Sequence, residues 1–336
     1  MPGQFAAVDD LAEGFQRRGG QPGVAYGIVA EGRLVRSGGW GERWLGGPTP
    51  DAGTVFRIAS MTKSFTAAAV LALRDDGRLA LDDPAEESVP ELRGLALPSP
   101  DSPRVSLRHL LTMTAGFPTD DPWGDRQQEL PLAEFSAFLA RGLSFAWAPG
   151  TRFEYSNLGY AILGRVITAA TGQPYSEFVR DRLLRPLGLT SSGFEASEFD
   201  VGQLACGYRR GPGGWEELVP DGYGAFAPMG GVFSCVTDLA RWVSGFTGAF
   251  PPGEPGTGGV HPLARSTRRE MQLPQVTLTP PALARLPGDP AESGPAGYGF
   301  GCSWRSTRSK GGSPATAAAI RDLAATCAGT PRPASA

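Results

Sequence analysis

The sequence predicts an α/β (α+β) protein in which an antiparallel sheet flanked by helices is interrupted by a large helical insertion. Three observations predict this fold class. Strand patterns occur near both ends of the 336-residue chain, helical patterns fill the stretch between them, and most of those helices end at Gly or Pro. We therefore expect a sheet domain built from residues 1–80 and 226–301 and a helical domain from residues 81–225.

The N-terminal part carries the first strand signals. Residues 5–18 predict a short helix, and residues 22–42 read as two strands joined by a tight turn at Glu31-Gly32. A longer helix is expected from about residue 60 to residue 76. Its apolar residues Phe65, Ala69 and Leu73 recur at helical spacing, and Gly77 follows as a stop signal.

The middle of the chain is mainly helical by pattern. Helices are expected within residues 106–113, 132–143, 157–172 and 175–189, and residues 227–246 read as a strand that enters a helix. Residues 251–260 predict a flexible loop, and "GYGFG" at 297–301 should begin or lie in a strand. Strands near both ends thus enclose a helical insertion.

The bulk composition excludes several classes of partner. An apolar fraction of 41% and a charged fraction of 19% are typical of a soluble globular protein. The net charge is −3 and no basic run exceeds two residues, so we expect no nucleic-acid partner. No stretch of 18 apolar residues occurs and the N-terminus does not read as a signal peptide, so we expect no membrane span and a cytoplasmic location.

Cysteine and histidine give no sign of a cofactor. The four cysteines, at 206, 235, 302 and 327, lack any CxxC spacing, which favours reduced structural thiols. The two histidines, at 109 and 261, cannot build a His-rich metal site alone, and the first lies in an apolar helical run that favours a structural role. We therefore expect no metal and no cofactor. The sequence carries no signal of oligomeric state.

The strongest chemical signal is "SMTK" at the start of the helix expected near residue 60. Ser60 and Lys63 are three residues apart, so hydroxyl and amine can meet on one helix face. A serine is a weak nucleophile without a nearby base, and a buried lysine can be that base because burial lowers the pKa of an amine. The alternative is a helix-capping serine beside an exposed lysine.

The scarcity of lysine favours the catalytic interpretation. Lys63 and Lys310 are the only lysines, so 29 of the 31 basic residues are arginine. Arginine does not lose its proton in proteins and could not serve as a base. A cation that was merely solvated at position 63 would, in this chain, be expected to be arginine.

A second element, "FEYSNLGYAILGRVI" at 153–167, places polar residues before a helix. Ser156 or Asn157 would cap that helix, which leaves Tyr155 and Asn157 in the preceding loop. A tyrosine can relay a proton beside a cation, and an asparagine offers both a donor and an acceptor. The alternative is that Tyr155 packs and Asn157 only caps.

Together these motifs resemble the serine hydrolases of the β-lactamase and penicillin-binding-protein superfamily, and most closely class C β-lactamases with the related esterases and D-amino-acid peptidases. The resemblance covers about residues 20–301 and includes "LLTMTAGF", "RPLGLTSSGF" and "GGVFSCVTDLARW". It implies a β-lactamase/transpeptidase-like fold. It also implies that Ser60 is acylated, that Lys63 and Tyr155 form the base pair, and that Asn157 contacts Lys63 and the carbonyl side of the substrate.

The segment after Gly301 departs from the family pattern. The family carries Lys-Thr-Gly or His-x-Gly on a strand beyond "YGFG", whereas residues 302–336 contain no His, Val, Tyr or Phe. We expect an anomalous tail that lacks the last strands. Either Lys310-Gly311-Gly312 replaces the missing motif, or the tail is a frameshift product, because "TAAAIRDLAA" from Thr316 can encode His-Ser-Gly-Gly in another frame. We favour the frameshift.

The sequence thus predicts a serine hydrolase that forms an acyl-enzyme on Ser60 and acts on a carboxylic ester, a β-lactam or a D-amino-acid amide. The absent export signal favours an ester or small amide over a cell-wall substrate. Loss of one oxyanion donor with the final strand would cost roughly 10²–10³ in rate, so weak or absent activity is expected. The alternative is a non-catalytic remnant, or a protein of the same fold that binds acyl groups without turnover.

Overall fold

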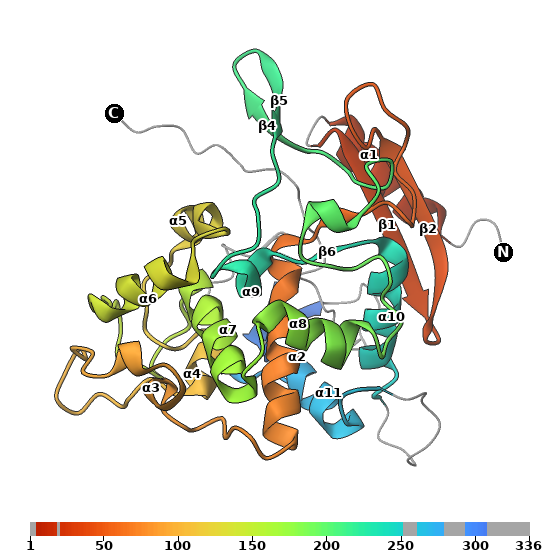
Figure 1. The fold of residues 1–336 in the computed structure, drawn as a ribbon. Coiled ribbons are helices and arrows are strands. Elements are labelled where there is room, and N and C mark those ends of the chain that lie inside the picture. Colours follow the sequence, from red (N-terminus) through yellow and green to blue (C-terminus); the bar gives the residue numbers. More distant parts are fainter. Residues whose placement is uncertain (1–4, 19–20, 251–260, 279–292, 308–336) are drawn as a thin grey trace.

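The computed structural model describes residues 5–18, 21–250, 261–278 and 293–307. A long central helix, α2 (Thr62–Asp75), runs through the middle of the molecule, with several other helices beside it (Figure 1). Every residue from Thr62 to Leu73 is buried. A helix that is apolar or enclosed on all sides belongs to the core of a protein, so α2 is the element on which the rest of the fold is packed.

The N-terminal prediction is confirmed. Helix α1 (Ala6–Arg17) precedes an antiparallel hairpin of β1 (Gly23–Ala30) and β2 (Arg33–Gly41). The turn residues Glu31 and Gly32 both have positive φ, at 51° and 72°, which matches the right-handed twist of a two-residue hairpin. Helix α10 (Val236–Thr247) packs against both strands and joins the hairpin to the core.

The central helix is preceded by a short 3-10 turn, η1 (Ala59–Met61), which follows strand β3 (Phe56–Arg57). The α-helix therefore begins at Thr62, two residues later than the sequence indicates, and it ends before Gly77, whose φ of 72° confirms the predicted stop. Helix α10 is fixed to α2 by Trp242, which stacks on Phe65 with ring centroids 4.2 Å apart and donates to Ser64 Oγ at 3.0 Å.

The four helices expected between residues 106 and 189 are all present, in shorter form. Between residues 81 and 200 the structure contains these helical elements: α3 (Ala85–Ser88), η2 (Pro90–Leu92), α4 (Leu107–Leu111), α5 (Asp121–Gly124), η3 (Asp125–Gln127), α6 (Leu132–Ala140), α7 (Asn157–Thr171), α8 (Tyr175–Val179), the π-helical turn η4 (Arg180–Leu184) and η5 (Ala196–Glu198). Helix α7 packs directly against α2, and ten of its 15 residues are buried. His109 caps α4, where its Nδ1 accepts the Ser106 N–H at 3.2 Å, in keeping with the structural role expected for it.

The predicted helical domain is corrected at one place, since it also contains a β-hairpin. Strands β4 (Gly207–Gly211) and β5 (Gly214–Leu218) pair antiparallel and stand out from the body of the molecule (Figure 1). The sequence "GYRRGPGGWEEL" alternates weakly, so its strand pattern is hard to recognise. The chain then enters α9 (Ala227–Gly230) and β6 (Phe233–Ser234), which pairs with β3 and leads into α10 as predicted.

The C-terminal part of the fold also differs from the prediction. Helix α11 (Arg265–Gln272) is followed by three antiparallel strands, β7 (Val276–Thr277), β8 (Ser293–Tyr298) and β9 (Ser303–Thr307). β8 includes the start of "GYGFG". β9 lies within the segment predicted to be an anomalous tail, so that prediction is wrong for residues 303–307. The loop expected at 251–260, the alternative motif at Lys310 and the rest of the tail lie outside the described residues.

Among the described residues, all paired strands run antiparallel, as predicted. They form four small sheets, whereas the sequence predicted a single sheet. Their orders are β1-β2, β3-β6, β4-β5 and β7-β8-β9. Searching the described residues finds no helix with the length and apolar character needed to cross a membrane. Cys206, Cys235 and Cys302 form no disulfide. The strands therefore serve as a frame around the buried helices.

The turn between β8 and β9 is expected to be sensitive to a single methyl group. A Cβ at Gly301 would lie 2.7 Å from the Lys63 carbonyl oxygen and 3.0 Å from Ser64 Cα, and its φ is 68°. Gly301→Ala should therefore cost about 1–2 kcal/mol for the left-handed backbone and a further ~1–3 kcal/mol for overpacking. Gly77→Ala is the control, since φ there is 72° with no atom within 4 Å. Urea unfolding at neutral pH measures both; equal losses of stability would contradict the close packing.

Stability should also fall on acidification through His261. This imidazole lies between Trp242 and Phe246, and burial with the nearby Arg268 charge lowers its pKa from 6.5 to about 4. Between pH 6.5 and about 4 the imidazole is protonated in the unfolded chain but neutral in the folded protein. The free energy of unfolding therefore keeps its full value above pH 6.5 and decreases as the pH falls from 6.5 towards 4. His261→Asn should lose less stability than the wild type between pH 7.5 and 4.5, as measured by urea unfolding. Parallel pH curves for the two chains would refute the assignment.

Candidate active site

Ser60 lies directly before the buried central helix. It occupies the 3-10 turn η1 and is half-buried, whereas the residues that follow it are buried. The preceding residue, Ala59, has a φ of 46°, which is a left-handed conformation that costs about 1–2 kcal/mol for a residue with a Cβ. Backbone strain of this kind gathers at functional sites, where it holds a reactive group in one orientation.

Lys63 is buried, with 2% of its surface exposed, and its ammonium group has three acceptors. Nζ donates to Ser60 Oγ at 2.9 Å, to Asn157 Oδ1 at 2.8 Å and to the Met229 carbonyl oxygen at 2.9 Å. A protonated amine has three hydrogens, so each finds a partner. A buried charge is tolerated only when it is matched in this way.

Tyr155 closes the contact with the serine. Its hydroxyl lies 2.7 Å from Ser60 Oγ, and Lys63 Nζ lies 4.9 Å from the centre of its ring. Tyr160, which is fully buried, places its ring 5.8 Å from the same nitrogen and donates its hydroxyl to the Leu111 carbonyl at 3.0 Å. Two aromatic faces thus border the ammonium group, and only Tyr155 reaches the serine.

Asn157 is the first residue of α7 and is fully buried, rather than lying in the loop before the helix as the sequence suggested. Ser156 is the N-cap, because its Oγ accepts the Gly159 N–H at 3.2 Å. The absence of a side chain at Gly124 makes room for the asparagine, since a Cβ there would lie 2.8 Å from Asn157 Cβ. The helix start itself therefore sets the asparagine against Lys63.

Asp120 caps the same helix with its carboxylate, a role that the sequence analysis missed. Oδ1 accepts the Asn157 N–H and Oδ2 accepts the Leu158 N–H, both at 2.7 Å. Negative charge at a helix N-terminus is favourable because it satisfies free N–H groups and complements the helix dipole. Burial nevertheless raises the pKa of Asp120, against the lowering effect of these hydrogen bonds and of Lys63.

Asp121 fixes the orientation of the Asn157 amide. Asn157 Nδ2 donates to Asp121 Oδ1 at 3.0 Å, while the other end of the amide accepts from Lys63. A flipped amide would set its NH₂ group against the ammonium and its oxygen against a carboxylate. Asp121 therefore acts on Lys63 through Asn157, although it does not touch the serine.

Charged groups continue around the site. The pKa of Asp125 is raised by burial of its carboxyl and by the Asp121 charge, with Lys63 and Arg57 acting in the opposite direction. Arg57, three residues before the serine, donates to the Gly230 carbonyl at 3.1 Å and to Asp221 Oδ2 at 2.8 Å. Among the described residues no group of three His, Cys, Asp or Glu side chains is arranged to hold a metal ion.

The structure thus brings together all four residues selected from the sequence: Ser60, Lys63, Tyr155 and Asn157. Sequence reasoning missed the Met229 carbonyl and the pair Asp120 and Asp121. Two adjacent acidic residues in "FPTDDPW" were a visible signal, but no spacing rule connects them to an asparagine 36 residues away. Chemically, the arrangement offers a serine hydroxyl with an amine and a phenol in contact with it.

Comparison with known proteins agrees with this chemistry. A family model described as Beta-lactamase matches residues 8–325. Protein flp of Staphylococcus aureus (strain COL) is 29% identical over 208 residues, covering 60% of this chain and 40% of flp. The D-alanyl-D-alanine-carboxypeptidase/endopeptidase AmpH of Escherichia coli (strain K12) is 29% identical over 248 residues, covering 71% of this chain and 62% of AmpH. The chain therefore spans less than two thirds of the length of these relatives.

The arrangement of the elements is also similar to that of solved structures. The octameric penicillin-binding protein homologue from Pyrococcus abyssi superposes with a TM-score of 0.70 at 27% identity, covering 88% of this chain and 64% of that one. The family resemblance and the fold class predicted from the sequence motifs are thereby confirmed.

Removing the Asp121 carboxylate is expected to slow the reaction of Ser60. Asp121→Asn has nearly the same shape but no longer favours one orientation of the Asn157 amide, so the rate of reaction with an electrophilic serine probe should fall by roughly tenfold. Asp125→Asn is the matched control, because it removes a carboxylate from the same loop without a hydrogen bond to Asn157. Equal rates in the two variants would show that charge, not amide orientation, matters.

Proposed function

Because the chain belongs to the beta-lactamase family, we propose that it is a serine hydrolase that forms an acyl-enzyme on Ser60 and releases the acid with water. One observation carries this proposal: Lys63 Nζ and the Tyr155 hydroxyl both reach Ser60 Oγ, at 2.9 and 2.7 Å. The serine therefore has two proton-transfer partners in contact with it, within the reach required of a general base.

Lys63 acts as the base in its neutral form. A neutral amine has two hydrogens and one lone pair. The Asn157 oxygen and the Met229 carbonyl can accept both hydrogens, at 2.8 and 2.9 Å, which turns the lone pair towards Ser60 Oγ. When the amine takes up the serine proton, its third hydrogen points back at Ser60 Oγ. The same three contacts therefore serve both protonation states without movement of the side chain.

Tyr155 is placed to move the proton onward. Its hydroxyl contacts Ser60 Oγ, and the Lys63 charge 4.9 Å from its ring centre favours a developing phenolate. In acylation, Ser60 Oγ attacks the carbonyl carbon, its proton passes to the Lys63–Tyr155 pair, and that pair returns a proton to the leaving group. In deacylation, water attacks the ester carbon, gives its proton to the same pair, and Ser60 leaves with that proton restored.

The substrate class follows from the electrophile that such a site accepts. An acylated serine can form from a carboxylic ester, a β-lactam or a D-amino-acid amide, and the relative AmpH is named a D-alanyl-D-alanine carboxypeptidase/endopeptidase. The fold alone does not choose between these carbonyl compounds. Side-by-side turnover of a p-nitrophenyl ester and a chromogenic cephalosporin ranks them, with the ester expected to be the better substrate.

A second candidate function is binding of acyl groups without turnover. The observation that favours it is the sequence of β8 and β9, since neither strand carries Lys-Thr-Gly or His-x-Gly within residues 293–307. Such a motif would accompany a second backbone donor to the oxyanion, and one donor is typically worth about 10²–10³ in rate. Without that donor the serine would not be acylated at a useful rate, and the protein would hold acyl groups non-covalently, without turnover.

Covalent labelling separates the two candidates. A fluorophosphonate probe is expected to label the wild-type chain and to leave Ser60→Ala unlabelled, because Ser60 Oγ is the hydroxyl that Lys63 Nζ and the Tyr155 hydroxyl both reach. Lys63→Arg places a permanently protonated group there that cannot take up the proton, so labelling should slow by about 10²–10⁴-fold. Intact-mass time courses measure both rates, and circular dichroism checks that each variant is folded. A folded wild-type chain that takes up no label would refute the hydrolase and leave the binding function.

A further inference from the structure

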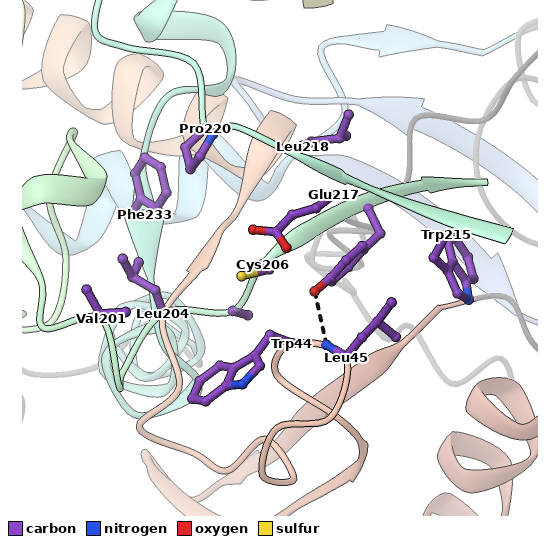
Figure 2. Close-up of a pocket in the computed structure, with 12 residues that line it drawn as sticks. Trp44, Leu45, Val201, Leu204, Cys206, Trp215, Glu217, Leu218, Pro220 and Phe233 are labelled. Atoms are coloured by element: carbon purple, nitrogen blue, oxygen red, sulfur yellow. Dashed lines mark hydrogen bonds between the residues drawn. The ribbon is translucent and has the colours of Figure 1, made fainter. Parts of the chain in front are cut away.

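A second cavity lies apart from the serine, under the β4–β5 hairpin. Figure 2 shows the hairpin forming one wall and the loop after β2, with Trp44 and Leu45, forming the other. The cavity has a volume of about 470 Å³, within the usual range of small-molecule sites. Its floor contains Leu204 and Phe233, and none of the four candidate catalytic residues lines it.

The cavity is mainly apolar and open at its rim. Leu45 and Val201 border it and are 47% and 84% exposed, although burying such side chains is normally favourable. Aromatic rings are provided by Trp44, Tyr208 and Trp215. Exposed apolar residues around a hollow of this size are typical of a ligand site.

Three polar side chains face the cavity, and one of them carries charge. Burial raises the pKa of Cys206 and of Tyr208, so the thiol and the phenol stay neutral at pH 7. The Tyr208 hydroxyl already accepts the Leu45 N–H at 3.0 Å. Among the described residues of the lining, Glu217 is the only one with a carboxylate or a basic group. It points towards the middle of the cavity beside Cys206, with whose thiol it forms a hydrogen bond.

The hairpin register separates Glu217 from the neighbouring acid. Glu217 lies opposite Tyr208 in the ladder, and Glu216 lies opposite Arg209, so the two glutamates point to opposite faces of the ribbon. Glu216 is neutralised by Arg209 at 2.7 Å. Within the part of the chain that the structure describes, no basic side chain forms an ion pair with Glu217. Arg210, which is paired with Trp215 in the ladder, lies over the Trp215 ring at 4.9 Å.

We propose that this cavity binds a small organic cation, an ammonium group carried on an apolar or aromatic body. The ammonium pairs with the Glu217 carboxylate at the open side. The apolar body lies against Trp44, Leu204 and Phe233. A carboxylate that has no ion pair among the described residues and lies beside aromatic faces suits such a ligand, because ion pairing and cation–π attraction add to the burial of apolar surface. An anionic ligand would be repelled by the same carboxylate, and a neutral one would gain only the apolar contact.

The test is direct binding of benzyltrimethylammonium chloride to the full chain, followed by calorimetry and by tryptophan fluorescence. The wild type should bind it, and Glu217→Gln should weaken binding by about tenfold or more, because one charge-assisted contact is lost. Glu216→Gln is the matched control, since it removes the same charge one residue away on the opposite face, and it should bind within twofold of the wild type. Ser60→Ala should bind unchanged, which separates this site from the proposed hydrolase.

Two ligand controls complete the experiment. Benzyl alcohol, which is neutral, and phenylacetate, which is anionic, should both bind at least about tenfold more weakly than the cation. The proposal is overturned if the wild type fails to bind the cation, if the two glutamate variants weaken binding equally, or if benzyl alcohol binds as tightly. Trp44→Ala should weaken all aromatic ligands, whatever their charge, and unchanged affinity in that variant would place the ligand elsewhere.

Discussion

The buried ammonium group of Lys63 is the constraint on which the site and much of the core depend. Removing an ion from water costs several kcal/mol unless its hydrogens are matched by acceptors. Here the acceptors come from three separate elements: Ser60 from the turn before α2, Asn157 from the start of α7, and the Met229 carbonyl from α9. If any of these elements shifts, a charge is left unmatched inside the protein. The same requirement that stabilises the core therefore also holds the Ser60 hydroxyl and the Lys63 amine in contact.

The neighbouring elements satisfy this constraint because they carry glycine or aspartate at the positions that approach Lys63 and Asn157. Gly124 and Gly301 have no side chain where α5 and the β8–β9 turn approach Asn157 and Lys63. Asp120 supplies charge at the start of α7, where the free N–H groups of the helix need acceptors. The start of α5, which holds the aspartates, thus belongs to the candidate site, although it is distant in sequence from the serine.

The chain divides its possible binding functions between the rigid core and a projecting hairpin. The serine site is built on buried helices that cannot move independently, which suits chemistry that depends on contacts of 2.7–2.9 Å. The second cavity lies between a hairpin and a loop near the surface, where ligand sites vary without disturbing the core. Alternation along β5 turns Glu217 inward and Glu216 outward, so a shift of one residue in register would exchange them.

The sequence by itself determined most of the helices and the four residues that meet at the candidate site. Helical spacing indicated α2 and α7, the glycine at 77 marked a helix end, and "SMTK" with "YSN" identified the serine, lysine, tyrosine and asparagine. Only the tertiary structure decided what surrounds them. The contact of Lys63 with the Met229 carbonyl cannot be recognised in a sequence, because every residue has a backbone carbonyl. Asp121 meets Asn157 because the chain folds back on itself, and no regular sequence spacing indicates that contact. The β4–β5 hairpin was missed because its strands are short and half-exposed, so their pattern is faint. Local periodicity reports which face of an element is buried, whereas long-range contacts depend on how the elements pack together.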